Sequence, residues 1–109
     1  MTRRHRDRVP EVARRYAREV HRRLGRHVRE LILFGSHARG DASVASDYDF
    51  IVVLDRADRA LREAILDAGV KMLDDENALC AALVYGPDQW ERVKESPLGW
   101  NVQQEGIEL

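Results

Sequence analysis

The stretch from Leu33 to Phe50, LFGSHARGDASVASDYDF, decides the fold and contains two separate signals. The first is an apolar strand that ends in Gly35 and turns directly into Ser36 and a short helical segment. Backbone N–H groups and a hydroxyl then point at one place, an arrangement that binds phosphate. Gly35 has no side chain, so the backbone can approach a triphosphate closely.

The second signal is the pair Asp47 and Asp49, one residue apart where the next strand begins. Alternate residues of a strand project from the same face of a sheet, so the two carboxylates are predicted to converge and Tyr48 to point away. Their mutual repulsion would be relieved by Mg²⁺, which prefers oxygen ligands and also holds substrate phosphates. One or two such ions stabilise the attacking and leaving oxygens in nucleotidyl transfer.

The periodicity of apolar residues predicts the elements around this core. In chain order they are a helix over 10–25, strands over 31–34 and 49–54, a helix over 57–72, a strand over 79–85 and short helices after 87 and 98. The first two strands are expected to be neighbours in one sheet, covered on both faces. Gly69 is expected to weaken the last turns of the second long helix.

A chain of 109 residues, 44% of them hydrophobic, fits one domain with one core and leaves no room for a separate substrate domain. We divide residues 1–109 into an N-terminal basic helix (1–27), the strand–loop–strand core (28–56) and a C-terminal part with a helix, a third strand and the last helices (57–109). No apolar run approaches the ~20 residues that cross a bilayer. We expect a cytoplasmic protein with no membrane association.

The charge is unevenly distributed, because residues 1–29 contain 11 Arg against three acidic residues although the whole chain carries a net charge of -1. A basic face of this kind could bind nucleic acid or an acidic protein, or it could be the solvated side of a helix. We favour the solvated helix, so nucleic acid stays a less favoured partner.

The string Gly-Ser, ten residues, then Asp-x-Asp, with Ala38-Arg39-Gly40 inside it, resembles the minimal nucleotidyltransferases of the polymerase-beta-like superfamily, of the antitoxin type. The resemblance implies an α/β (α+β) fold, with a small mixed sheet of about three to four strands flanked by helices. It also implies that Gly35 and Ser36 engage the nucleoside triphosphate and that Asp47 and Asp49 are catalytic metal ligands. Arg39 would brace the loop or contact phosphate.

The same resemblance implies an adenylyltransferase that uses Mg²⁺ and ATP, or another nucleoside triphosphate, to transfer a nucleoside monophosphate to a hydroxyl group. Stand-alone members of this family are often paired with a helical HEPN protein, a toxic ribonuclease. We therefore expect a HEPN-type partner, with this chain acting as the antitoxin by AMPylation of that partner. Self-association is left open.

One residue of the family pattern is missing. Catalytic members usually carry a third acidic residue on the next strand, but residues 79–85 contain no Asp or Glu. Residues 74–76 before that strand, Asp88 after it, a partner or the substrate could supply the group. The alternative function is therefore a weakly active or inactive nucleotide-binding module that works by partner binding. An aminoglycoside-type nucleotidyltransferase is less favoured, since such enzymes generally carry an additional acceptor domain.

Four further side chains carry weaker predictions. His37 is interpreted as an exposed loop histidine. Arg39 suits phosphate and also suits an ion pair with Asp41 or Asp55. Trp90 and Trp100 are interpreted as core or interface residues, with Trp100 facing inward.

Overall fold

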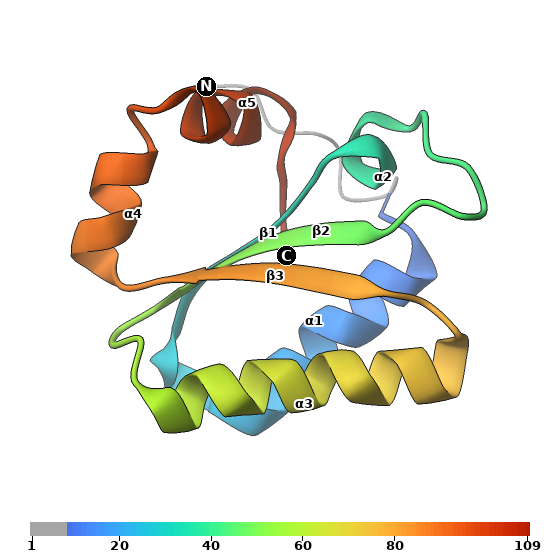
Figure 1. Cartoon of the computed structure of the whole chain (residues 1–109), viewed down its shortest axis with the longest axis horizontal. Coiled ribbons are helices and arrows are strands. Elements are labelled where there is room, and N and C mark those ends of the chain that lie inside the picture. The colour runs from blue at the N-terminus through green and yellow to red at the C-terminus, as the bar shows by residue number, and fades with distance from the viewer. Residues whose placement is uncertain (1–8) are drawn as a thin grey trace.

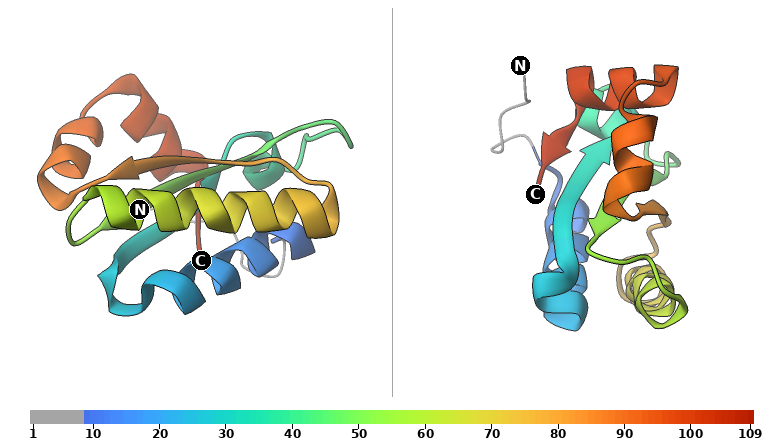
Figure 2. Two further views of the ribbon diagram at one scale, coloured as in Figure 1. Left: turned by 60° about the horizontal axis from the view of Figure 1, so that its bottom comes forward. Right: turned by 90° about the vertical axis from the view of Figure 1, so that its left-hand side faces the viewer.

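The computed structural model describes residues 9–109, and the first eight residues of the predicted basic helix lie outside this range. A four-stranded sheet lies between two layers of helices (Figure 1). The helices on one face are α1 (Glu11–Leu24) and α3 (Arg59–Glu76), and those on the other are α4 (Pro87–Val93) and α5 (Pro97–Glu105), as Figure 2 shows. A 3₁₀ turn, η2 (Gly25–His27), follows α1. No helix within the described range is long and apolar enough to span a membrane.

The sheet is mixed, as predicted. It consists of β1 (Val28–Phe34), β2 (Tyr48–Leu54), β3 (Cys80–Tyr85) and β4 (Ile107–Glu108), in the spatial order β3-β2-β1-β4. β1 runs antiparallel to both β2 and β4, and β2 runs parallel to β3 through the α3 crossover. β4 was not predicted from the sequence, because a two-residue strand carries no periodic signal.

The ends of the two long helices follow from local chemistry. α1 begins after Pro10 and ends at Gly25, whose φ of 55° suits a residue without a side chain. α3 is capped by Asp58, whose carboxylate accepts a hydrogen bond from the Leu61 N–H at 2.9 Å. The expected weakening at Gly69 does not shorten α3, which continues to Glu76.

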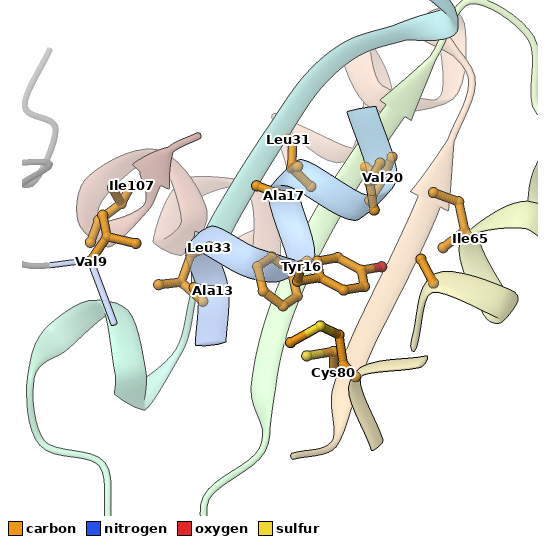
Figure 3. Close-up of a cluster of buried hydrophobic side chains, with 14 of the residues drawn as sticks. Val9, Ala13, Tyr16, Ala17, Val20, Leu31, Leu33, Ile65, Cys80 and Ile107 are labelled. Carbon is orange, nitrogen blue, oxygen red and sulfur yellow. The ribbon is translucent and has the colours of Figure 1, made fainter. Parts of the chain in front are cut away.

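β2 is the centre of the core, and its five residues from Phe50 to Leu54 are buried. Phe50 stacks on Tyr16 of α1 with ring centroids 4.3 Å apart, in the larger apolar cluster drawn in Figure 3. A smaller cluster on the opposite face joins Ile51 and Val53 to Trp90 and Val102. Cys80 is buried in the larger cluster, as expected for a thiol that behaves as a small hydrophobe.

The two tryptophans differ. Trp90 is 2% exposed and packs in the smaller cluster, whereas Trp100 is 62% exposed, so the prediction that Trp100 faces inward is wrong. The reason lies on α5, where Gly99 and Val102 are the buried residues. Successive residues of a helix are about 100° apart, so burying Gly99 turns its neighbour Trp100 toward solvent.

Candidate functional site

The two signals of the sequence meet where β1 ends and β2 begins. Phe34, the last residue of β1, is paired with Asp49 across the antiparallel ladder. The chain turns immediately after Phe34 into the single-turn helix α2 (Ser36–Arg39), and it re-enters the sheet through the loop that leads to Asp47 (Figure 1). Gly35 is thereby brought against Asp49, with Ser36 next to it in the chain and Asp47 two positions before Asp49.

Gly35 and Asp49 fit each other closely. The φ of Gly35 is 81°, a backbone conformation that residues with side chains rarely adopt. A Cβ atom built on Gly35 would lie 2.6 Å from the Asp49 Oδ2 atom, which is closer than such atoms can approach. Position 35 therefore favours glycine because of its backbone conformation, and an added side chain would also displace the Asp49 carboxylate.

The α2 turn leaves hydrogen-bond donors free at this place. Ala38 and Arg39 both donate their N–H groups to the Gly35 carbonyl at 3.0 Å. Within residues 9–109, the N–H groups of Ser36 and His37 and the Ser36 hydroxyl make no hydrogen bond. The first amides of a helical turn have no intrahelical partner, so they can bind an external acceptor such as phosphate.

The Asp49 carboxylate is electrostatically unfavourable in its charged form. Partial burial raises its pKa, and the neighbouring Asp47 raises it further, while His37 and Arg39 act in the opposite direction. Asp47 lies just before β2 and is exposed. A cation between the two carboxylates would relieve both the burial penalty and the repulsion.

His37 is held in place, and its prediction as an exposed loop histidine is wrong. Its ring stacks on Tyr48 with centroids 3.7 Å apart and an interplanar angle of 10°. Its Nε2 atom lies 3.1 Å from the Ser46 carbonyl oxygen. His37 thus ties α2 to the segment that leads into Asp47. Tyr48 packs on the α1 side of the sheet, away from Asp49, as strand alternation predicted.

Arg39 is held between two carboxylates. Its Nε donates to Asp41 at 3.2 Å and its Nη1 to Glu105 of α5 at 3.2 Å. Of the two ion pairs considered from the sequence, the one with Asp41 is present, while Asp55 contacts His27 at 3.0 Å instead. The contact with Glu105 was missed, since no sequence pattern relates residues 66 positions apart.

Within the described part of the chain, β3 offers no third carboxylate beside Asp49. The residue paired with Asp49 on β3 is Ala81. Of the acidic residues considered as substitutes, Asp75 pairs with Lys71 at 2.9 Å and Glu76 with Arg15. Asp88 follows the far end of β3, because β2 and β3 run parallel. No group of three His, Cys, Asp or Glu residues that could hold a metal occurs within residues 9–109.

A strand–turn–helix junction with free amides beside two carboxylates is typical of proteins that bind nucleotide phosphates. The model of the nucleotidyltransferase domain family matches residues 13–100. This chain therefore belongs to the nucleotidyltransferase domain family, which confirms the resemblance to the minimal nucleotidyltransferases. The comparison with curated protein sequences gave no significant match.

Two solved structures share the fold. One is a toxin-antitoxin with AMP-PNP, at a TM-score of 0.61 and 18% identity, covering 85% of this chain and 68% of that one. The other is a putative nucleotidyltransferase from Sulfolobus solfataricus, at a TM-score of 0.51 and 21% identity, covering 94% of this chain and 79% of that one. The mixed α/β fold predicted from the sequence is confirmed.

Proposed function

We propose that this chain uses Mg²⁺ to transfer AMP from ATP to a hydroxyl group, with release of pyrophosphate. The observation that carries the proposal is the contact between Gly35 and Asp49, where a Cβ atom would lie 2.6 Å from the carboxylate oxygen. It joins a backbone turn with free donors to a carboxylate that favours a nearby cation. A triphosphate with its metal ion requires both features in one place.

Each residue has a distinct part in this proposal. Ser36 and the first amides of α2 bind the triphosphate, and Gly35 lets it approach the backbone. Asp47 and Asp49 hold the metal. Arg39 braces α2 against α5 through Glu105, and its positive charge favours the ionised form of Asp49. The acceptor oxygen attacks the α-phosphorus, the bond to pyrophosphate breaks, and the hydroxyl proton passes to a base or to water.

Two carboxylates are enough to bind a Mg²⁺ ion that is also coordinated by the phosphates of a nucleotide. This ion is usually bound by one or two carboxylates and keeps its other positions for substrate phosphates and water. The raised pKa of Asp49 indicates a pair of acids that gains from a cation. Bound there, the ion would neutralise charge that develops on the phosphates.

The choice of nucleotide and partner rests on the neighbouring structure. That protein was crystallised as a toxin-antitoxin with AMP-PNP, an ATP analogue, which supports ATP as the donor. It also supports a toxin as the partner of this chain, and we infer a HEPN-type ribonuclease that is AMPylated on a hydroxyl. In this proposal the chain is the antitoxin.

A module that binds nucleotide without transfer is the second candidate, and one observation favours it. Ala81 lies beside Asp49 on β3, so the general base or extra metal ligand that this strand would offer is missing. In this case the chain would neutralise its partner by assembly alone, with the nucleotide stabilising the complex.

A transfer assay distinguishes the two candidate functions. The chain is incubated with labelled ATP, Mg²⁺ and a HEPN-type partner, and the label on the partner is measured. We expect label on the partner with the wild-type chain and none with Asp47→Asn or Asp49→Asn. Asp67→Asn is the matched control, because Asp67 is an exposed aspartate on α3. Retention of label by both site variants would contradict the assignment of the metal ligands.

Binding without transfer is measured in the same samples by calorimetry with AMP-PNP and Mg²⁺. Binding that each site variant weakens at least about tenfold, with no label on the partner, supports the binding module. No Mg²⁺-dependent binding of any nucleotide by the wild-type chain would refute both candidates.

A further inference from the structure

The His37 ring is fixed by two contacts of different kinds, although the proposed transfer gives this residue no part. It stacks on the Tyr48 ring with the centroids 3.7 Å apart and the ring planes at 10°. Its Nε2 atom lies 3.1 Å from the Ser46 carbonyl oxygen. A carbonyl oxygen only accepts hydrogen bonds, so Nε2 carries the hydrogen and donates it.

The two residues that His37 contacts flank the candidate metal ligand Asp47. Ser46 precedes this aspartate and Tyr48 follows it, so the His37 ring touches the chain on both sides of it. Before Asp47 the chain is otherwise held by a local turn, in which the Ser46 N–H donates to the Ser43 carbonyl at 3.1 Å. His37 is therefore the link from α2 to the segment that carries Asp47.

This link leaves the two carboxylates available. Tyr48 packs on the α1 side of the sheet, and Asp49 points to the opposite side, because neighbouring residues of a strand alternate. Within the part of the chain that the structure describes, no hydrogen bond or ion pair joins His37 to Asp47 or Asp49. His37 thus acts on the backbone beside the aspartates, and their oxygens remain free to bind an ion.

We propose that His37 is a positioning residue for the metal ion, a role that rests on the proposed function of the site. Asp47 is exposed and lies at the end of a loop, so its carboxylate has little other support. By holding the backbone on both sides, His37 keeps Asp47 at the start of β2, near Asp49, before an ion arrives. A ligand that is already in place does not have to be ordered by the ion, and the ion binds more tightly.

Amide hydrogen exchange measured by NMR tests the positioning without metal or nucleotide. We expect the Ser46 amide to exchange at least about tenfold faster in His37→Ala than in the wild type, because opening of this segment no longer breaks the two contacts. The Leu61 amide, which the Asp58 carboxylate caps at the start of α3, is the internal reference and should not change. An unchanged Ser46 exchange rate in His37→Ala would refute the proposal.

Calorimetry with AMP-PNP at increasing Mg²⁺ concentrations tests the consequence for the ion. We expect His37→Ala to raise the Mg²⁺ concentration at half-saturation by about tenfold to hundredfold, as residues that orient metal ligands usually do. A positive charge on His37 would disfavour a nearby cation, so its removal alone would strengthen Mg²⁺ binding. The direction of the change therefore distinguishes positioning from an effect of charge.

His21→Ala is the matched control, because His21 is an exposed histidine on α1, and it should bind Mg²⁺ as the wild type does. Circular dichroism melting curves establish that both alanine variants are folded. A wild-type chain without Mg²⁺-dependent binding refutes the proposed function and this inference with it. Wild-type binding that His37→Ala leaves unchanged refutes this inference alone.

Two conservative variants separate the contacts. His37→Phe keeps a ring that can stack on Tyr48, and His37→Gln keeps an N–H donor as many bonds from the backbone as Nε2. We expect each variant to recover part of the Mg²⁺ affinity that His37→Ala loses. If neither recovers any, the stack and the hydrogen bond do not position the metal ligand.

Discussion

The two faces of the sheet are covered unequally. The more fully covered face contributes most of the core, and the other face carries Asp49 of the candidate site. Along β2, Phe50 and alternate residues enter the larger cluster beneath α1 and α3, while Ile51 and Val53 enter the smaller one beneath α4 and α5. Asp49 lies on the second face, beyond the cover of Trp90 and Val102. One strand therefore contributes core residues and a candidate metal ligand within two positions.

The connections of the chain explain this inequality. α3 is an 18-residue crossover that runs the length of the sheet, whereas α4 and α5 have seven and nine residues. Both short helices follow the carboxyl end of β3, which is the end opposite Asp49. The smaller cluster that they cover therefore lies toward that end of the sheet, and α5 reaches the candidate site only through the pair between Glu105 and Arg39.

The largest test of this comparison is Phe50→Ala. Phe50 is fully buried and stacked on Tyr16, so its loss leaves a cavity beneath α1. We expect the free energy of unfolding to fall by about 3–5 kcal/mol. Urea unfolding followed by circular dichroism measures the change. A loss below about 1 kcal/mol would mean that the α1 side is not the stabilising face.

Gly99→Ala tests the second face. An added Cβ would lie 2.0 Å from the Val93 carbonyl oxygen, a backbone atom that cannot move alone, so α4 and α5 must separate. We expect a loss of about 1–3 kcal/mol, smaller than that of Phe50→Ala. Gly86→Ala is the control, because its Cβ would meet nothing closer than 3.7 Å. Equal unfolding midpoints for the two alanine variants would contradict the predicted clash.

Glu19→Gln tests the charge on the stabilising face. The hydrogen bond from Arg22 lowers the pKa of Glu19 most. Burial raises this pKa, but a second hydrogen bond from Arg23 lowers it again, so the pKa stays below its ordinary value of 4.5. A lowered pKa means that the ion pairs stabilise the fold above pH 4.5 and that this stabilisation is lost as the pH falls through the lowered value. The variant should be less stable than the wild type at pH 7 by up to about 1 kcal/mol.

Unfolding curves measured from pH 7 down to pH 2 should bring the Glu19→Gln variant and the wild type together at the acidic end. Glu63→Gln is the control, since the Glu63 carboxylate is exposed in its pair with Arg59. A difference that does not change with pH would show that packing, rather than charge, determines the effect of Glu19.

Asp49→Asn should have the smallest effect on stability, although Asp49 adjoins Phe50. Burial and the neighbouring Asp47 both disfavour the charged form of Asp49. Removing the charge therefore removes a repulsion and does not cost a stabilising ion pair. We expect the free energy of unfolding to stay within about 0.5 kcal/mol of the wild type. Chemical denaturation checks this value. A loss comparable to that of Phe50→Ala would assign Asp49 to the fold.

Local patterns predicted the parts of the molecule that local physics controls. The three- and four-residue apolar steps of α1 and the continuous apolar run of β2 each reflect the faces that those elements bury. The Gly-Ser turn and the alternation of Asp47, Tyr48 and Asp49 depend only on neighbouring residues. For the same reason Tyr48 was correctly predicted to point away from Asp49.

Long-range contacts were beyond the reach of such patterns. The stacking of His37 on Tyr48, the pairing of Arg39 with Glu105 and the position of Ala81 beside Asp49 all join separate elements. Trp90 and Trp100 have equal propensities, and packing alone buries one and exposes the other. The open β3 edge also exists only once the strand order is known.

From its amino-acid order alone, this chain specifies its helices, its main strands and a turn that sets a glycine and a serine near two aspartates. Each helix and strand arises from neighbouring residues, where propensity and side-chain alternation are sufficient, and the turn and the aspartates are close enough in the chain to be joined by one short connection. Which face of the sheet stays open, what holds Arg39 and His37, and which edge is free to pair depend on how distant segments meet. Packing decides these points, because the contact energies involved appear only after the chain has folded.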